Sequence, residues 1–164
     1  MILRLYVHNF GCLENFELDI GDRHSALLLG KNGTGKSTIR RVLSLLQAIA
    51  RGTNRVGSLV RPRDCFRERT DEPVRLEIEA VLRGIRYQYR LVLELPPGFK
   101  EFRVQRESLI VDGRSLYTRE HALVTLAKST GGAGFSLDWH LVALPIIQES
   151  SETDPLHIFK NWLA

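Results

Sequence analysis

Apolar and polar residues alternate along much of the N-terminal part of the chain. Residues 2–7 and 16–20 carry apolar side chains at every second position, which is the spacing of half-buried strands. Residues 25–29, which read Ser-Ala-Leu-Leu-Leu, are instead apolar without interruption, and such a run is typical of a strand buried on both faces. The pattern therefore predicts three strands before residue 30.

Residues 36–50 change to a helical spacing. Their apolar side chains recur three and four positions apart, so they would share one face of a helix: Ile39, Val42, Leu43, Leu46 and Ile49. Polar side chains occupy the opposite face, and Gly52 follows as a residue type that commonly ends helices. We therefore predict one amphipathic helix over 36–50.

A spacing of two returns after an arginine-rich stretch. Residues 51–73 are polar and predict a long, partly mobile loop. The segment 74–127 predicts an antiparallel β meander, with strands at 74–82, 85–95, 101–111 and 115–126. Asp112-Gly113 separates two of these strands and favours a tight hairpin turn.

The last part of the chain predicts a loop, a strand and a short helix. Residues 128–134 are rich in glycine, and residues 135–147 are largely apolar and predict a strand that ends at Gln148. Asp154-Pro155 has the form of a cap residue followed by proline in the first turn. The helix that follows would carry an apolar face, which we expect to be exposed and to find a partner: Ile158, Phe159, Trp162 and Leu163.

Size and composition narrow the class of protein. A chain of 164 residues suits one domain with a real core. It has neither a signal peptide nor an apolar run near the roughly 18 residues of a membrane span, so we expect a cytoplasmic protein without a membrane partner. Cys12 and Cys65 lack metal-ligand spacing and fit structural thiols. The net charge of +4 permits a polyanionic partner such as DNA.

A phosphate-loop pattern lies between the apolar run and the helix. It consists of a glycine, four residues, a second glycine, a lysine and a serine, and the strand and helix on either side are the context that this motif requires. The residues predicted to bind the nucleotide are Gly30, Lys31, Asn32, Gly33, Thr34, Gly35, Lys36, Ser37 and Thr38. The predicted cofactors are ATP, or another purine nucleoside triphosphate, and Mg²⁺.

Each residue type in the motif has a physical role. The glycines let the backbone approach phosphate oxygens, and successive N–H groups then form an anion-binding nest at the positive end of the helix dipole. Lys36 supplies a mobile positive charge for the β- and γ-phosphates. The Ser37 hydroxyl is a predicted magnesium ligand, and Thr38 is in reach of the α-phosphate.

The sequence from Leu3 to Phe10, followed by a strand and by Gly30–Thr38, resembles the head domains of ABC-type ATPases of the chromosome-maintenance and recombination-repair class, a class that includes AAA-family ATP-binding proteins. The Asn-Phe pair at Asn9 and Phe10 and the asparagine at Asn32 are typical of that class. The resemblance implies an α/β P-loop NTPase lobe, with a phosphate-loop strand and helix plus an antiparallel meander. It implies a role in DNA repair, chromosome maintenance or phage defence.

The resemblance also implies which parts of a head are present. It predicts a single N-terminal lobe over 1–164: strands, loop and first helix in 1–50, a loop in 51–73, a β subdomain in 74–127, and a strand and glutamine loop in 135–164. Gln148 matches the glutamine that ligates magnesium in that class. The chain has Gly11 where relatives often have arginine, and it lacks the signature serine motif and the Asp-Glu strand. We therefore expect ATP hydrolysis only in a complete head, closed by a second copy of the chain or by a C-terminal half.

Two other functions fit the same loop. A small P-loop kinase would use Asp112, at the end of the apolar residues 109–111, as a magnesium ligand, although a hairpin turn explains the same residues. A nucleotide-binding interaction module would bind ATP without turnover. The arginines of the 51–73 loop fit a solvated surface, with a nucleic-acid contact as the alternative: Arg61, Arg63, Arg67 and Arg69.

Overall fold

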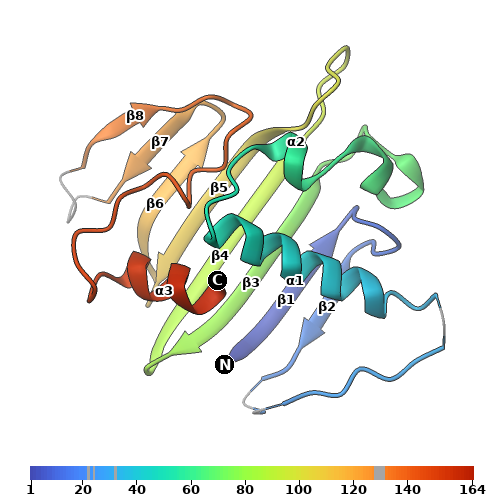
Figure 1. Ribbon diagram of the computed structural model, residues 1–164, viewed down its shortest axis with the longest axis horizontal. Helices are drawn as coiled ribbons and strands as arrows, with labels where there is room; N and C mark the ends of the chain where they lie inside the picture. Colours follow the sequence, from blue (N-terminus) through green and yellow to red (C-terminus); the bar gives the residue numbers. More distant parts are fainter. Residues whose placement is uncertain (22, 24, 32, 128–131) are drawn as a thin grey trace.

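The computed structural model describes residues 1–164 except 22, 24, 32 and 128–131. In the described part, eight strands form one antiparallel sheet in the order β2-β1-β3-β4-β5-β6-β7-β8. Two helices, α1 (Lys36–Ala50) and α3 (Pro155–Leu163), lie on one face of this sheet, as Figure 1 shows. The strands are β1 (Ile2–His8), β2 (Phe16–Asp19), β3 (Val74–Leu82), β4 (Ile85–Glu94), β5 (Arg103–Val111), β6 (Arg114–Glu120), β7 (Leu123–Leu126) and β8 (Gly134–Ser136).

The meander follows the predicted pattern closely. β3 and β4 pair along their whole length, from Val74–Leu93 to Leu82–Ile85. The turn between β5 and β6 is the predicted Asp112-Gly113 hairpin, in which both residues have positive φ, as the twist of a two-residue hairpin requires. The predicted strand over 115–126 is two strands, because the chain turns back at residues 121–122.

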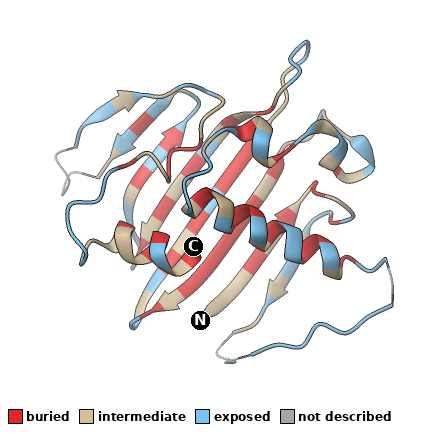
Figure 2. Cartoon of the chain, viewed as in Figure 1, coloured by how far each residue is buried: buried red, intermediate tan, exposed pale blue. Residues whose placement is uncertain are grey.

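The core lies between the sheet and the two helices (Figure 2). The predicted helix over 36–50 is confirmed as α1. The prediction of an exposed apolar face on α3 is wrong for Phe159 and Leu163, which are buried. Phe159 stacks on Tyr87 with the ring centroids 5.7 Å apart, so the apolar face of α3 finds its partner in the sheet. No helix in the described part of the chain is long and apolar enough to cross a membrane.

The apolar run at 25–29 does not form the predicted buried strand. These residues have no regular structure, and the side chains of Leu27 and Leu29 are 82% and 83% exposed. A strand buried on both faces must pair along both edges. In the described residues each strand of the sheet pairs with those next to it in the sheet order, and none of them pairs with this run.

Residues 137–147 also depart from the predicted strand, since only Gly134–Ser136 pairs with the sheet. Pro145 has no N–H group for a sheet ladder, and two neighbouring N–H groups are taken by a side chain instead. The buried carboxylate of Glu107 accepts hydrogen bonds from Ala143 N at 2.7 Å and Leu144 N at 2.8 Å. The segment therefore crosses over the sheet rather than extending its edge.

The arginine-rich segment 51–73 is more ordered than predicted. It contains the short helix α2 (Val56–Leu59) and two single turns of 3₁₀ helix at Pro62–Asp64 and Phe66–Glu68. Backbone hydrogen bonds link it to the last segment of the chain, from Val56 N to His140 O at 2.8 Å and from Val142 N to Asn54 O at 2.7 Å. These contacts hold the segment against the body of the domain.

Candidate nucleotide site

The start of α1 lacks the partners that usually satisfy a helix end. Its N-cap is Gly35, which has no side chain to accept a hydrogen bond, and no acidic residue occupies the first turn. The first N–H groups of a helix need an acceptor, and the helix dipole favours a negative one. Among the described residues, no side-chain cap or first-turn carboxylate occupies this helix start, and an anion would suit it.

The loop before the helix is curled rather than extended. Thr34 N donates to Lys31 O at 3.4 Å, and Gly33 and Gly35 have φ of +88° and +95°. A Cβ atom on Gly30 would lie 2.8 Å from Thr34 Oγ1, so the two ends of the loop approach each other closely. Asn32, a predicted phosphate-loop residue, lies outside the described residues.

The Lys36 ammonium lies over the curled loop. It donates to the backbone oxygens of Gly30 and of Lys31, the latter at 2.7 Å, and it lies 3.4 Å from Thr34 Oγ1. A lysine held by carbonyl oxygens at the mouth of the loop places a positive charge beside the uncapped helix start. The glycines of the loop, the Lys36 charge and the helix start together suit a polyphosphate. All of them come from one short stretch of chain.

Ser37 and Thr38 point to different surroundings. Ser37 is exposed and lines an open cavity with Phe10, Arg40 and Arg41, among others. Among the described residues, no aspartate or glutamate lines that cavity. Thr38 is buried, and its hydroxyl lies 3.3 Å from Cys12 Sγ in the turn after β1.

Gln148 and Asp112 lie away from this site. Gln148 is exposed and lines a different cavity, with Leu116 and Tyr117 of β6 and Leu126 of β7. In Figure 1 the orange-red segment before α3 lies near β6, towards the other end of the strand order from the blue start of α1. This arrangement does not support the prediction that Gln148 and Ser37 share one magnesium ion, because β1 and β6 are separated by β3, β4 and β5.

Asp112 is part of the hairpin turn rather than of a metal site. Its carboxylate accepts a hydrogen bond from Arg86 N at 2.8 Å, and its own N–H donates to Arg86 O at 2.9 Å. Among the described residues, no group of three or more His, Cys, Asp or Glu side chains is placed to hold a metal ion. A magnesium ion at the loop would therefore depend on Ser37 and on the phosphates themselves.

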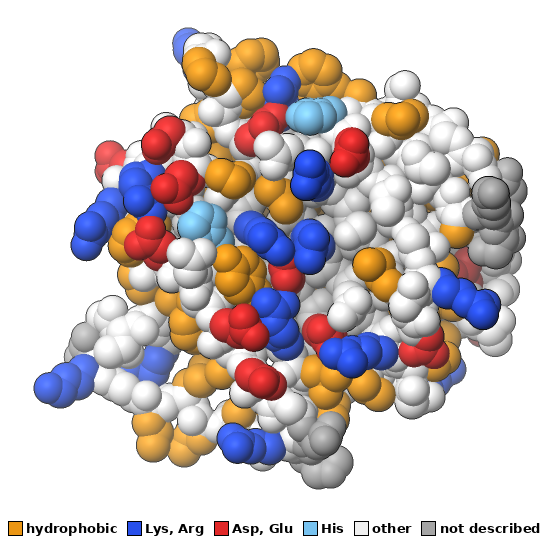
Figure 3. Space-filling view, turned by 180° about the vertical axis from the view of Figure 1, so that it is seen from behind, with side chains coloured by type: hydrophobic (Ala, Val, Ile, Leu, Met, Phe, Trp, Pro, Cys, Tyr) orange, Lys and Arg blue, Asp and Glu red, His pale blue; other side chains and the backbone are white. Residues whose placement is uncertain are grey.

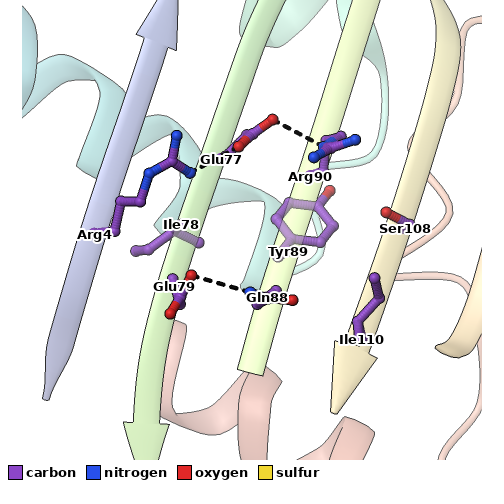
Figure 4. Close-up of a pocket in the computed structure, with 9 residues that line it drawn as sticks. All are labelled: Arg4, Glu77, Ile78, Glu79, Gln88, Tyr89, Arg90, Ser108 and Ile110. Carbon is purple, nitrogen blue, oxygen red and sulfur yellow. Dashed lines mark hydrogen bonds and ion pairs between the residues drawn. The ribbon is translucent and has the colours of Figure 1, made fainter. Parts of the chain in front are cut away.

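The open face of the sheet carries a second cluster of charges (Figure 3). Figure 4 shows its centre, a cavity of about 150 Å³, where the carboxylate of Glu77 lies between Arg4 and Arg90 at 2.8 Å from each. Burial alone would raise the pKa of Glu77, but hydrogen bonds from Arg4 and Arg75 outweigh it and the pKa is lowered. Positive and negative groups neutralise each other here, so this face is a weaker candidate for a triphosphate than the loop.

One residue near the site is missed by sequence reasoning. Asn9 is fully buried, and its amide makes three hydrogen bonds to the arginine-rich segment. The Asn-Phe pair marks the position in the sequence, but nothing in the pattern of neighbouring residues indicates what the side chain contacts.

The comparisons with known proteins concern the same N-terminal part. Residues 1–78 match the model of a family described as AAA ATPase domain. The matched region holds β1, β2, the loop, α1 and the arginine-rich segment, and it ends within β3. The N-terminal part of the chain is therefore similar to an AAA ATPase domain.

The chain is also similar to part of a chromosome-maintenance protein. Over 68 residues, the chain is 41% identical to structural maintenance of chromosomes protein 6 of Saccharomyces cerevisiae. The alignment covers 41% of this chain and 6% of that protein, so the chain spans a small part of the relative's length. Together the matches confirm the predicted resemblance to the N-terminal part of an ABC-type ATPase head of the chromosome-maintenance class.

Proposed function

We propose that this chain binds ATP with Mg²⁺ through Gly30–Thr38, as the N-terminal part of an ABC-type ATPase head. The observation that carries the proposal is the uncapped start of α1 beside the Lys36 ammonium. Both groups attract negative charge, and no acidic side chain of the first turn competes with a ligand. The match to an ATPase family over the same residues supports ATP as the anion.

Each side chain then has a distinct task. Lys36 would leave the carbonyl oxygens of Gly30 and Lys31 and bind the β- and γ-phosphates, which is a stronger interaction because both partners are charged. Ser37 is exposed and would reach the magnesium ion. Thr38 would support the loop through its contact with Cys12, and its N–H group would remain available to the α-phosphate.

We further propose that the complete head acts in chromosome maintenance, DNA repair or phage defence. The similarity to a chromosome-maintenance protein supports this context. A second copy of the chain or a C-terminal half of the head would complete the site. The exposed side chains of Leu27 and Leu29 support such a partner, because a run of apolar residues is rarely left in water.

We expect little or no hydrolysis by this chain alone. Hydrolysis needs a residue that orients the attacking water. The cavity at Ser37 is lined by arginine, serine and apolar side chains, with no carboxylate among the described residues. The position of Asp112 in the β5–β6 hairpin argues against the kinase alternative.

Titration calorimetry with MgATP tests the proposal. Wild-type protein should bind, and Lys36→Ala should bind roughly a hundredfold more weakly or not at all, because it removes the charged hydrogen bonds to the phosphates. The control is Lys100→Ala, which removes an exposed lysine next to β5 and should leave the affinity unchanged. Equal affinity of Lys36→Ala and wild-type protein would contradict the site.

A further inference from the structure

Asn9 joins two segments that are far apart in the sequence. Its side-chain N–H₂ group donates to Arg69 O and to Glu72 O, each at 2.8 Å, and its side-chain oxygen accepts from Phe66 N at 3.0 Å. The side chain is 0% exposed. Two donors and one acceptor at one short side chain are what an amide provides, so the site is matched to asparagine.

The segment held by Asn9 reaches both the turn after β1 and helix α1. Gly11 N donates to Asp64 O at 2.6 Å, and Asp64 Oδ1 accepts from Arg41 Nη2 of α1, also at 2.6 Å. The Arg41 guanidinium also lies over the ring of Phe10, 5.2 Å from its centroid. The turn after β1, the arginine-rich segment and α1 therefore each contact the other two.

The turn after β1 supports the first residues of α1 directly. A Cβ atom on Gly11 would lie 2.6 Å from Thr38 Cγ2, so only glycine lets the turn approach this closely. The two residues after Gly11 also contact the start of the helix. Cys12 Sγ lies 3.3 Å from Thr38 Oγ1, and a Cβ atom on Gly35 would lie 2.8 Å from the Leu13 side chain. The turn thus fixes the backbone that carries Lys36, Ser37 and Thr38.

We propose that Asn9 is a positioning residue for the phosphate loop. By holding the backbone of residues 66–72, it fixes the turn Phe10–Leu13, and that turn fixes the start of α1 in the orientation that presents its N–H groups to the phosphates. The inference rests on the proposed function, since it assigns Asn9 a role in nucleotide affinity as well as in folding. No contact between Asn9 and the nucleotide is required.

The test compares two asparagines that share a backbone conformation. Asn9 and Asn15 both have positive φ, 54° and 49°, but Asn15 is exposed. Asn9→Gly keeps the backbone conformation accessible and removes the three hydrogen bonds, and Asn9→Asp keeps the shape but turns both donors into acceptors. The control is Asn15→Gly, which makes the same substitution at an exposed position and removes one hydrogen bond, from the Tyr6 hydroxyl, instead of three.

MgATP affinity is measured by calorimetry at a temperature where circular dichroism shows every variant folded. We expect both Asn9 variants to bind MgATP about tenfold more weakly than wild-type protein, which is within the range for residues that influence a site without contacting the ligand. Asn15→Gly should bind with wild-type affinity. Hydrogen exchange should become faster in 36–41 and 64–69 and remain unchanged in β3–β5. Wild-type affinity in a folded Asn9 variant would overturn the inference while leaving the proposed function intact.

A second variant covers the case in which Asn9 variants do not fold. Gly11→Ala leaves the Asn9 side chain unchanged, but its Cβ would meet Thr38 and its φ of +61° is strained for alanine, so it should weaken ATP binding and speed exchange in 36–41. Unchanged affinity and exchange in Gly11→Ala would overturn the inference. If wild-type protein binds no MgATP, the proposed function fails, and faster exchange in 36–41 of Asn9→Gly still decides whether Asn9 fixes the helix start.

Discussion

The sheet and the phosphate loop are stabilised in opposite ways. At the centre of the sheet, the buried Glu107 carboxylate accepts hydrogen bonds from the Tyr89 and Tyr117 hydroxyls at 3.1 and 2.8 Å, as well as from two backbone N–H groups. The loop at 30–35 is curled under one lysine side chain, and the apolar residues before it are exposed. One region has its polar groups satisfied by the protein, whereas in the described part of the other no side chain caps the helix start where we propose that the nucleotide binds.

If the loop binds the nucleotide as proposed, this difference separates stability from function in the molecule. Arg119 faces Glu107 at 3.8 Å and donates to Asp138 O and Leu141 O, so one buried network binds the segment 138–144 to the sheet. Burial raises the pKa of Glu107, and its hydrogen bonds and the charge of Arg119 oppose that effect. Changes in the sheet should therefore lower stability, and changes in the loop should lower affinity.

The largest expected effect is in the sheet. Glu107→Ala removes four hydrogen bonds and leaves the buried Arg119 charge without its carboxylate partner, which should cost about 3–5 kcal/mol of unfolding free energy. Urea unfolding followed by circular dichroism measures the loss. Glu107→Gln retains an acceptor and the shape and should lose less. A loss below about 1 kcal/mol for Glu107→Ala would show that the network contributes little.

In the loop, Lys36→Ala should lower ATP affinity without lowering the stability of the fold. ATP affinity should fall roughly a hundredfold or more, but the unfolding free energy without nucleotide should change by only about 0.5 kcal/mol, because the Lys36 ammonium bonds only to the exposed loop. Urea unfolding with and without MgATP measures both effects. Strong destabilisation of the nucleotide-free protein would break the comparison, since the loop would then be part of the stable core.

A smaller effect is expected at the cap of α3. Asp154 accepts hydrogen bonds from Leu156 N and Ser150 N, each at 2.9 Å, and Asp154→Ala should cost about 1 kcal/mol. Burial would raise the pKa of Asp154, but these hydrogen bonds outweigh it and lower the pKa. The contribution is therefore complete at neutral pH, begins to fall as the pH drops below the ordinary value of 3.8, and is lost as the pH passes through the lowered pKa of the folded state.

Thermal unfolding of wild-type protein and Asp154→Ala between pH 7 and pH 3 measures that contribution. The two curves should differ at pH 7, and the difference should become smaller towards pH 3. Glu152→Ala changes an exposed acidic residue near the same helix start and is the matched control. A difference that grows as the pH falls would contradict the assignment of the cap.

The smallest effect is expected at Asp112. Asp112→Asn keeps a side chain suited to positive φ in the hairpin, so stability should change by about 0.5 kcal/mol or less. Affinity for MgATP should be unchanged, because the residue lies in the β5–β6 turn and not at the loop. A large loss of magnesium-dependent binding would restore the kinase hypothesis.

Local pattern predicts the meander and the helices well, because strand and helix spacings depend on neighbouring residues. β3 and α1 have the predicted bounds, and α3 begins at the predicted Asp154-Pro155 pair. The pattern fails where a distant residue decides the backbone. Glu107 takes N–H groups that a strand over 135–147 would need, and Asn9 makes hydrogen bonds to the backbone of a segment predicted to be partly mobile.

The candidate site is predictable in part for the same reason. The loop lies in one stretch of chain, and the lysine, the glycines and the helix start are neighbours in sequence. The turn under Thr38 and the separation of Gln148 from Ser37 depend on the order of strands in the sheet, which spacing alone does not reveal. A buried strand at 25–29 requires neighbouring strands to pair with it, and its own apolar composition does not supply them.

Hydrogen exchange of wild-type protein with and without MgATP tests the central claim most directly, because it locates the ligand without a mutation. The amides of residues 33–38 should become protected when MgATP is added, and those of β3–β6 should not change. Protection confined to the open face of the sheet around Glu77, or no protection in 33–38 at saturating MgATP, would contradict a nucleotide site at the start of α1.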